Sequence, residues 1–178
     1  MLKHLSKLVI LALSLSNIAF CLSLRNFREI NQAESFATGV LGDPLLVKKV
    51  TPRLPQSGRI SEYTPASQMA LATLASDYCN RRWQADSDLP AEQRLFYSEI
   101  DYSQGVSQLH GAKLETLLRK LGQQFWQRDL ETEELSLLNL YAAELISSGE
   151  SLQNATLLIC TLFGTSPAVS LFPEEKNG

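Results

Sequence analysis

The sequence predicts an all-α protein, an irregular bundle of four to six helices that follows an N-terminal signal peptide. Two observations lead to this prediction. Apolar residues recur at helical spacing in several segments after residue 24, and Gly, Pro or short polar runs separate these segments. No segment alternates apolar and polar residues with hairpin signals beside it, as strands of an antiparallel sheet do.

The N-terminal segment MLKHLSKLVILALSLSNIAFCLSL has the composition of a secretory signal peptide. A basic start precedes the almost wholly apolar residues 8–19, and small residues follow. They fit a cut before Leu22, which makes residues 1–21 the signal peptide; a cut after residue 23 is the second possibility. We therefore expect a periplasmic or extracellular protein. The alternative is an uncleaved membrane anchor, because the apolar run reaches the lower end of the ~17–25 residues that span a bilayer.

The length and charge of the remaining chain indicate how many domains it has and which partners it binds. Without residues 1–21 it has 157 residues, enough for one domain with its own core. The formal charge falls from −3 to −5, because the removed segment holds two lysines and no acid. Nucleic-acid binders usually carry a basic stripe, so nucleic acid is not an expected partner. We expect another envelope protein as partner and no integral membrane span in the mature chain.

Cys79 and Cys160 are the two cysteines that remain if the cut removes Cys21. An even number of cysteines in an exported chain favours a disulfide. The alternatives are inert buried thiols, or a catalytic thiol with His110, the mature chain's one histidine, as its base. Haem attachment of the c type and a zinc site both need further Cys or His ligands, so we expect no metal and no cofactor.

Residues 22–64 are expected to hold a short helix and a proline-rich connector. Apolar residues at three- and four-residue intervals predict a helix over 25–38. The apolar face of this helix consists of Phe27, Ile30, Ala33 and Phe36. Three prolines and a glycine between residues 43 and 61 predict an extended connector.

A helical domain is expected over 65–172. Thr64 as N-cap and Pro65 at the first helical position begin a helix that runs to about Trp83. A polar break follows at 84–91, and residues 92–101 suit one or two helical turns.

Three longer helices complete this domain. Leu114, Leu117, Leu118, Leu121 and Phe125 form one apolar stripe on a helix over about 111–127. Further helices are expected over about 131–147 and from Ser151 to Gly164. A charged tail, residues 173–178, ends the chain.

The stretch RDLETEELSLLNLYAAELISSGESLQNATLLICTLFGTSPAVSLF, residues 128–172, has a recognisable arrangement. An aromatic FWQR lead-in precedes a helix opened by paired glutamates, and a second helix ends in Thr-Ser-Pro. This segment resembles the C-terminal part of planctomycete-cytochrome-associated exported proteins, while FREINQAESFATGV and LASDYCN resemble a small exported bacterial helical family of unknown function. The resemblance implies work in the envelope beside such proteins and carries over no catalytic residue. The chain lacks C-x-x-C-H, so it does not share their haem function.

Two clusters of aromatic and basic residues are the candidate interface. Trp and Arg are over-represented among the residues that dominate binding energy at protein interfaces. The alternative is that each Trp covers the core at a helix end, with Arg solvated beside it. The candidate residues are Arg81, Arg82, Trp83, Phe125, Trp126 and Arg128.

Carboxylates are the remaining candidates for chemistry. Glu99 with Asp101, or Glu131 with Glu133 and Glu134, could pair as in a glycosidase. The second group equally suits the first turn of a helix, where acids complement the helix dipole. No nucleophile elbow, P-loop or dinucleotide fingerprint occurs, so no catalytic residue is assigned.

The leading hypothesis from the sequence is therefore a non-enzymatic, exported, disulfide-stapled helical protein that acts as an interaction or assembly module in the cell envelope. The alternatives are an envelope hydrolase that uses a carboxylate pair, and an accessory protein of a cytochrome-like envelope complex.

Overall fold

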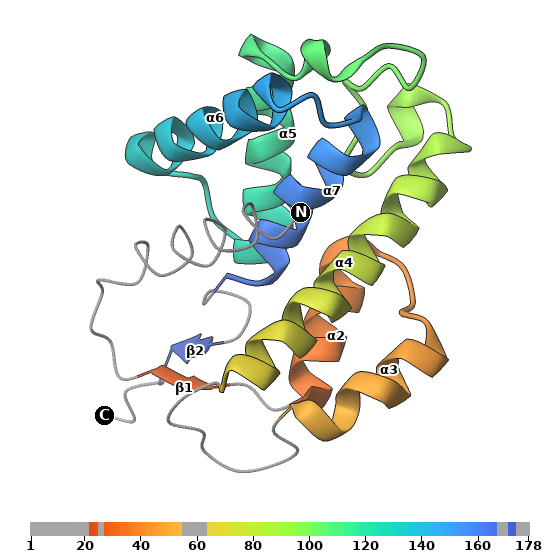
Figure 1. Ribbon diagram of the computed structural model, residues 1–178, viewed down its shortest axis with the longest axis vertical. Coiled ribbons are helices and arrows are strands. Elements are labelled where there is room, and N and C mark those ends of the chain that lie inside the picture. The colour runs from red at the N-terminus through yellow and green to blue at the C-terminus, as the bar shows by residue number, and fades with distance from the viewer. Residues whose placement is uncertain (1–21, 25–26, 55–63, 167–170, 174–178) are drawn as a thin grey trace.

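The computed structural model describes residues 22–24, 27–54, 64–166 and 171–173; the predicted signal peptide lies outside them. Within these residues the chain forms six α-helices, which confirms the all-α prediction (Figure 1). They are α2 (Phe27–Thr38), α3 (Pro44–Val50), α4 (Pro65–Ser87), α5 (Gly111–Leu121), α6 (Thr132–Ser147) and α7 (Leu152–Gly164). The strands β1 (Leu22–Leu24) and β2 (Leu171–Pro173) form one short antiparallel pair that the sequence does not predict.

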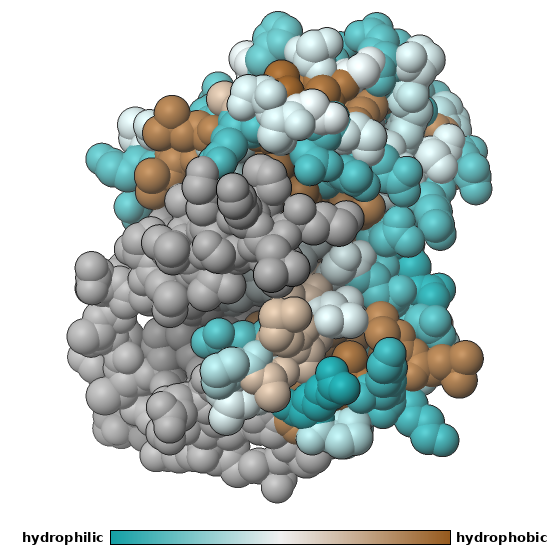
Figure 2. Space-filling model, viewed as in Figure 1, coloured by the Kyte–Doolittle hydropathy of each residue, from teal (hydrophilic) through white to brown (hydrophobic). Residues whose placement is uncertain are grey.

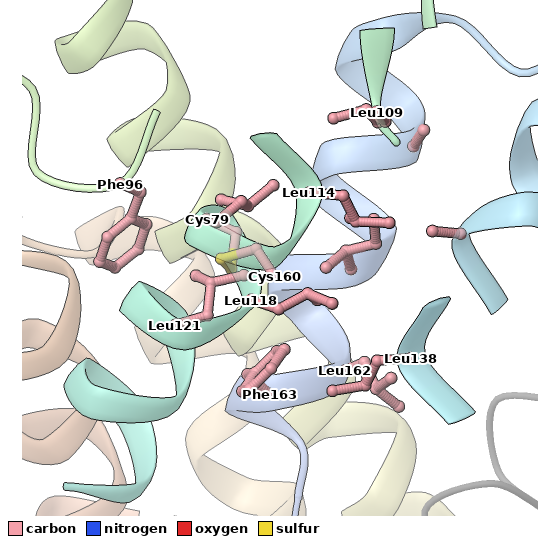
Figure 3. Close-up of a cluster of buried hydrophobic side chains, with 14 of the residues drawn as sticks. Cys79, Phe96, Leu109, Leu114, Leu118, Leu121, Leu138, Cys160, Leu162 and Phe163 are labelled. Atoms are coloured by element: carbon pink, nitrogen blue, oxygen red, sulfur yellow. A yellow bond between two sulfur atoms is a disulfide. The ribbon is translucent and has the colours of Figure 1, made fainter. Parts of the chain in front are cut away.

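The predicted disulfide between Cys79 and Cys160 is present and joins α4 to α7. The two Cα atoms lie 6.0 Å apart, and both side chains are fully buried. One helical turn away, a Cβ atom added to Gly164 would lie 2.9 Å from the Cβ atom of Ala75. The two helices are therefore antiparallel and closely packed, and Figure 3 shows the sulfur–sulfur bond surrounded by apolar side chains.

Buried apolar side chains form two clusters, and α4 contributes to both. The larger cluster lies mainly between α4, α5, α6 and α7 and contains both bridged cysteines. The smaller lies where α2 and α3 meet the N-terminal half of α4, and consists of Ile30, Val50, Leu54, Ala70, Leu71, Leu74 and Tyr78. Residues before position 64 supply three members of this cluster, so they belong to the same folded unit as the predicted helical domain.

The segment between α2 and α4 begins as a helix, contrary to the prediction of an extended connector. Asp43 is the N-cap of α3, with its Oδ1 atom accepting a hydrogen bond from the Leu45 N–H at 2.9 Å. Pro44 occupies the first helical position, and Pro52 stands near the start of a 3₁₀ turn, Thr51–Arg53. Prolines at these positions remove no hydrogen bond of the helix, which is why the segment tolerates them. The rest of the connector, residues 55–63, lies outside the described residues.

α4 continues one turn beyond its predicted end, so the polar break starts later than the sequence predicts. The Thr64 side chain accepts a hydrogen bond from the Ser67 N–H at 3.2 Å, as expected of an N-cap. At the other end, the helix includes residues 84–87. From Asp88 to His110 the chain is irregular apart from two short 3₁₀ turns, Ala91–Gln93 and Val106–Gln108.

The predicted helix over 111–127 is divided in two. Regular α-helix ends at Leu121, and a π-helical turn, η4 (Gly122–Trp126), continues it. A Cβ atom at Gly122 would lie 2.9 Å from the Leu130 side chain, so glycine allows the returning chain to approach here. Gln127, with φ of 53°, then ends the helix.

The last two helices begin as predicted. The Glu134 carboxylate accepts a hydrogen bond from the Glu131 N–H at 2.9 Å, which satisfies a free donor at the start of α6. The Ser151 hydroxyl accepts one from the Asn154 N–H at 3.1 Å at the start of α7.

Replacing both bridged cysteines, as in C79A/C160A, should lower the free energy of unfolding by about 4 kcal/mol, because the bridge closes a loop between residues 81 apart. Helix content by circular dichroism should stay unchanged, and the loss should appear as a lower urea midpoint. Reducing the native protein should give the same midpoint as the variant. An unchanged midpoint in C79A/C160A would contradict a stabilising role for the bridge.

Candidate functional site

The first aromatic–basic cluster, at the C-terminal half of α4, is mostly buried. Arg82 forms an ion pair with the fully buried Asp86, with Nη2 and Oδ1 2.5 Å apart. Trp83 is only 7% exposed, and its ring meets those of Tyr97 and Tyr102 edge-on at 5.0 and 4.5 Å. Arg82 and Trp83 thus contribute to the core rather than to the surface. Arg81 alone remains partly exposed.

The second cluster follows α5 and is buried in part. The Phe125 ring lies inside the larger apolar cluster, 5.9 Å from that of Phe96. Trp126 packs 4.6 Å from the Phe163 ring and donates its Nε1–H to the Phe163 carbonyl at 3.3 Å. Arg128 lies over the Trp126 ring at 5.1 Å and pairs with Glu134 at 2.6 Å.

Ring contacts inside the protein connect the two clusters. Trp83 contacts Tyr97, Tyr97 contacts Phe96 at 5.9 Å, and Phe96 contacts Phe125. The spacing of aromatic residues beside arginines therefore marks a buried seam between α4, the loop after it and α5. Arg82, Trp83 and Phe125 are therefore buried, as the alternative expects, while Arg81, Trp126 and Arg128 keep part of their surface exposed.

Asp86 is a buried polar centre that the sequence analysis misses. Besides Arg82, its carboxylate accepts hydrogen bonds from the backbone N–H groups of Leu95, Phe96 and Tyr97 at 2.9, 3.0 and 3.2 Å. A carboxylate with four donors holds the irregular loop against the end of α4. The signal available in the sequence is the Arg–Asp pair at i, i+4.

The carboxylate candidates form no buried acid pair. Glu99 and Asp101 line one shallow cleft together with Arg94, and both are exposed. Hydrogen bonds from Ser103 lower the pKa of Asp101. For Glu134 partial burial acts in the opposite sense, but hydrogen bonds from Arg128 and a backbone N–H still lower its pKa. Asp101 and Glu134 are therefore ionised at neutral pH, and neither is held as a proton donor.

Helix α2 exposes an aromatic residue that the sequence predicts on its apolar face. Phe36 is 75% exposed, whereas Ala37 and the fully buried Glu34 face the protein. At about 100° of rotation per residue, Ala37 lies within about 20° of Ile30 around the helix axis, whereas Phe36 lies about 120° away, so the buried face is rotated away from the predicted one. Three of the exposed large apolar residues follow one another here, Phe36, Leu41 at 80% and Leu45 at 77%.

Basic side chains accompany these apolar ones on α3 and the turn after it. Leu45, Lys48 and Lys49 are all exposed and stand at i, i+3 and i+4, so they share one face of α3. Arg53 is exposed just beyond. We call the set of Phe36, Leu41, Leu45, Lys48, Lys49 and Arg53 the α2–α3 corner. Figure 2 shows apolar surface at the right-hand edge of the molecule, where Figure 1 places α3.

Contacts with α4 hold this corner in place. Tyr78 donates its hydroxyl to Asn31 Oδ1 at 3.0 Å, and a Cβ atom at Gly42 would lie 2.9 Å from the Tyr78 ring. The Asp43 N–H donates to Asp77 Oδ2 at 2.9 Å. Only a glycine allows the turn to pass so close to the tyrosine, so the exposed side chains sit on a fixed backbone.

Glu34 lies behind the corner, between the two apolar clusters, and is chemically the most unusual group described. It is 0% exposed, and neither carboxyl oxygen has a hydrogen-bond partner. A Cβ atom at Gly164 would lie 2.9 Å from one of these oxygens, so the carboxyl fills the space that this glycine leaves. Burial raises the pKa of Glu34 well above its usual value, and the neutral acid is the form that fits.

Sequence periodicity could have indicated Glu34. Glu34 comes four residues after Ile30 and three before Ala37, so the three residues share one face of a helix. The larger ring of Phe36 outweighs this signal in any hydrophobicity pattern. Only the packing against Gly164 identifies which face is buried.

No group of three or more His, Cys, Asp or Glu side chains able to hold a metal ion is found among the residues that the structure describes. Over the same residues, no helix combines the length and the apolar character needed to cross a bilayer. His110, the candidate base of a thiol, is exposed at the start of α5, and both possible partners are oxidised to the disulfide.

No family model, curated protein or solved structure matches the chain. The resemblance to exported bacterial proteins drawn from residues 128–172 therefore stays a prediction.

Replacing Glu34 with methionine should raise the free energy of unfolding at neutral pH and flatten its dependence on pH. The folded carboxyl holds its proton to higher pH than the unfolded one, whose pKa is 4.5. The contribution of Glu34 to the free energy of unfolding is thus complete below the pKa of the unfolded state. It is lost as pH rises through the raised pKa of the folded state, and the free energy of unfolding then falls by up to about 1.4 kcal/mol per pH unit. Urea unfolding from about pH 5 to about pH 8 measures this slope.

Glu133→Gln is the matched control, because this acid is exposed on α6. It should keep the slope of the native protein. The prediction is wrong if the free energy of unfolding of the native protein rises steadily from about pH 5 to about pH 8 and that of E34M rises in the same way. This result would show that Glu34 is ionised in the folded protein.

Asp86→Asn keeps the shape of the side chain and removes its charge. We expect a loss of about 3 kcal/mol in unfolding free energy, because the buried Arg82 loses its counter-charge and backbone donors lose acceptors. Tryptophan fluorescence should also change, since Trp83 packs on the loop that Asp86 holds. Asp88→Asn, at an exposed position two residues on, should leave both quantities within error.

Proposed function

We propose that this chain is an exported, disulfide-stapled helical protein that acts as an interaction module in the cell envelope, and that the α2–α3 corner is its contact surface. The proposal rests mainly on the exposure of Phe36, Leu41 and Leu45, because most large apolar side chains of the described chain are buried in its core. Large apolar side chains left exposed on consecutive segments of a folded protein are candidate sites of association. Here they stand on a backbone that contacts with α4 hold fixed.

Two further observations support the proposal. The buried bridge between α4 and α7 suits an oxidising compartment, where disulfides persist. The orientation of α2 supports a contact role for Phe36. With Glu34 inside and Phe36 outside, the helix gives up burial of an aromatic ring, worth about 2 kcal/mol, and the exposed ring is then available to a partner.

The experiment is photo-crosslinking in the producing cell, with a photoreactive residue placed at Leu45 or at Leu140. Both leucines are exposed on helices, at 77% and 67%, but α3 and α6 lie at opposite ends of the molecule (Figure 1). We expect an adduct from position 45 and none from position 140. The intact mass of the recovered protein should begin at Leu22 or Leu24, and two cysteines should be alkylated only after reduction.

Two results would contradict the proposal. Equal adduct yields from Leu45 and Leu140 would show that the corner is not a contact surface. A full-length mass with freely alkylated cysteines would show that the protein is not processed by export.

A further inference from the structure

The α2–α3 corner combines exposed apolar side chains with free cations. In the described part of the chain, Lys48, Lys49 and Arg53 take part in no ion pair. The acids near them are engaged elsewhere. Asp43 caps α3 and lies 3.7 Å from Arg81, which pairs with Asp77 at 3.0 Å. The corner is therefore locally basic, although the chain as a whole has a formal charge of −3.

From this combination we propose that the α2–α3 corner docks the protein onto an anionic phospholipid surface. This inference rests on the proposed function and names the partner of the contact surface. Leu41 and Leu45 enter the boundary between head groups and acyl chains, and the exposed Phe36 of the preceding helix adds apolar area. Lys48 and Lys49 bind the lipid phosphates with their ammonium groups while their stems follow the leucines toward the membrane.

The shape of the corner favours a lipid surface over a protein. The apolar side chains project from α2, the turn after it and the short helix α3, and the two clefts described, along residues 87–103 and 104–113, lie elsewhere. A stable protein interface buries about 800 Å² on each partner. Three separate side chains offer much less, whereas a fluid head-group layer adapts to single projecting residues. Leu45, Lys48 and Lys49 share one face of α3, so one apolar side chain and two ammonium groups reach the same surface.

The test measures binding to vesicles by flotation, with the protein in the form that intact mass identifies in the producing cell. One set of vesicles contains phosphatidylcholine with phosphatidylglycerol, and the other phosphatidylcholine alone. We expect binding to the anionic vesicles, little to the neutral ones, and a loss of binding as salt rises. K48Q/K49Q should weaken partitioning roughly 30-fold, and L41S/L45S at least about tenfold per leucine.

Matched controls separate the corner from general charge and hydrophobicity. K113Q/R119Q on α5 changes the net charge equally, and L140S on α6 removes another exposed leucine, at 67%; both variants should bind like the native protein. All substituted side chains of the corner are exposed, so the variants should keep the native circular dichroism and melting temperature.

Several outcomes would overturn the inference. They are equal binding to neutral and anionic vesicles, native-like binding by the corner variants, equal weakening by the α5 and α6 controls, or no binding at all. If the protein does not bind vesicles but position 45 still crosslinks to a protein in the cell, the lipid surface is excluded as the partner. The proposal that the corner is the contact surface of an interaction module is then retained. If position 45 gives no specific adduct of either kind, both proposals fail.

Discussion

The antiparallel contact between α4 and α7 is the constraint on which the other elements depend. Small residues, Ala75 and Gly164, let the helix backbones approach, and one turn away a buried disulfide fixes their register. α5 and α6 complete the apolar cluster around α7, while α2 and α3 use the N-terminal half of α4. Because α4 belongs to both clusters, the bridge also links, through that helix, the part of the chain that carries the α2–α3 corner.

Buried polar groups determine how the loop after α4 and helix α2 pack against the α4–α7 pair. Asp86 gathers three backbone N–H groups and an arginine, so the long loop after α4 is ordered without regular secondary structure. The aromatic run from Trp83 to Phe125 then packs beneath that loop. A buried carboxylate is costly to desolvate, but four donors offset the cost and fix one arrangement. The opposite case is Glu34, which has no donor and is accommodated by staying neutral.

Features with strong local signals could be predicted from the sequence. The helical class, the starts at Thr64 and Ser151 and the bridged cysteines follow from periodicity, capping residues and cysteine number. The predictions that were wrong concern features that depend on contacts between distant segments. The π turn after Leu121 needs Leu130 packed on Gly122, and the orientation of α2 needs Gly164 behind Glu34. The burial of Trp83 and Phe125 depends in the same way on the rings of Tyr97 and Phe96, which come from a loop whose path the sequence does not show.

Helix α2 connects the packing of this protein to the function we propose. A rotation about its axis toward the predicted apolar face would move Phe36 inward and carry Glu34 away from α7, toward solvent. The fold instead keeps the acid opposite Gly164, where a Cβ atom would lie 2.9 Å from a carboxyl oxygen of Glu34 and from the Cβ atom of Ala75. The orientation of α2 is therefore tied to the α4–α7 contact. Glu34 takes the buried position beside Gly164, and Phe36 stays on the exposed side of the helix, in the segment that leads to Leu41 and Leu45.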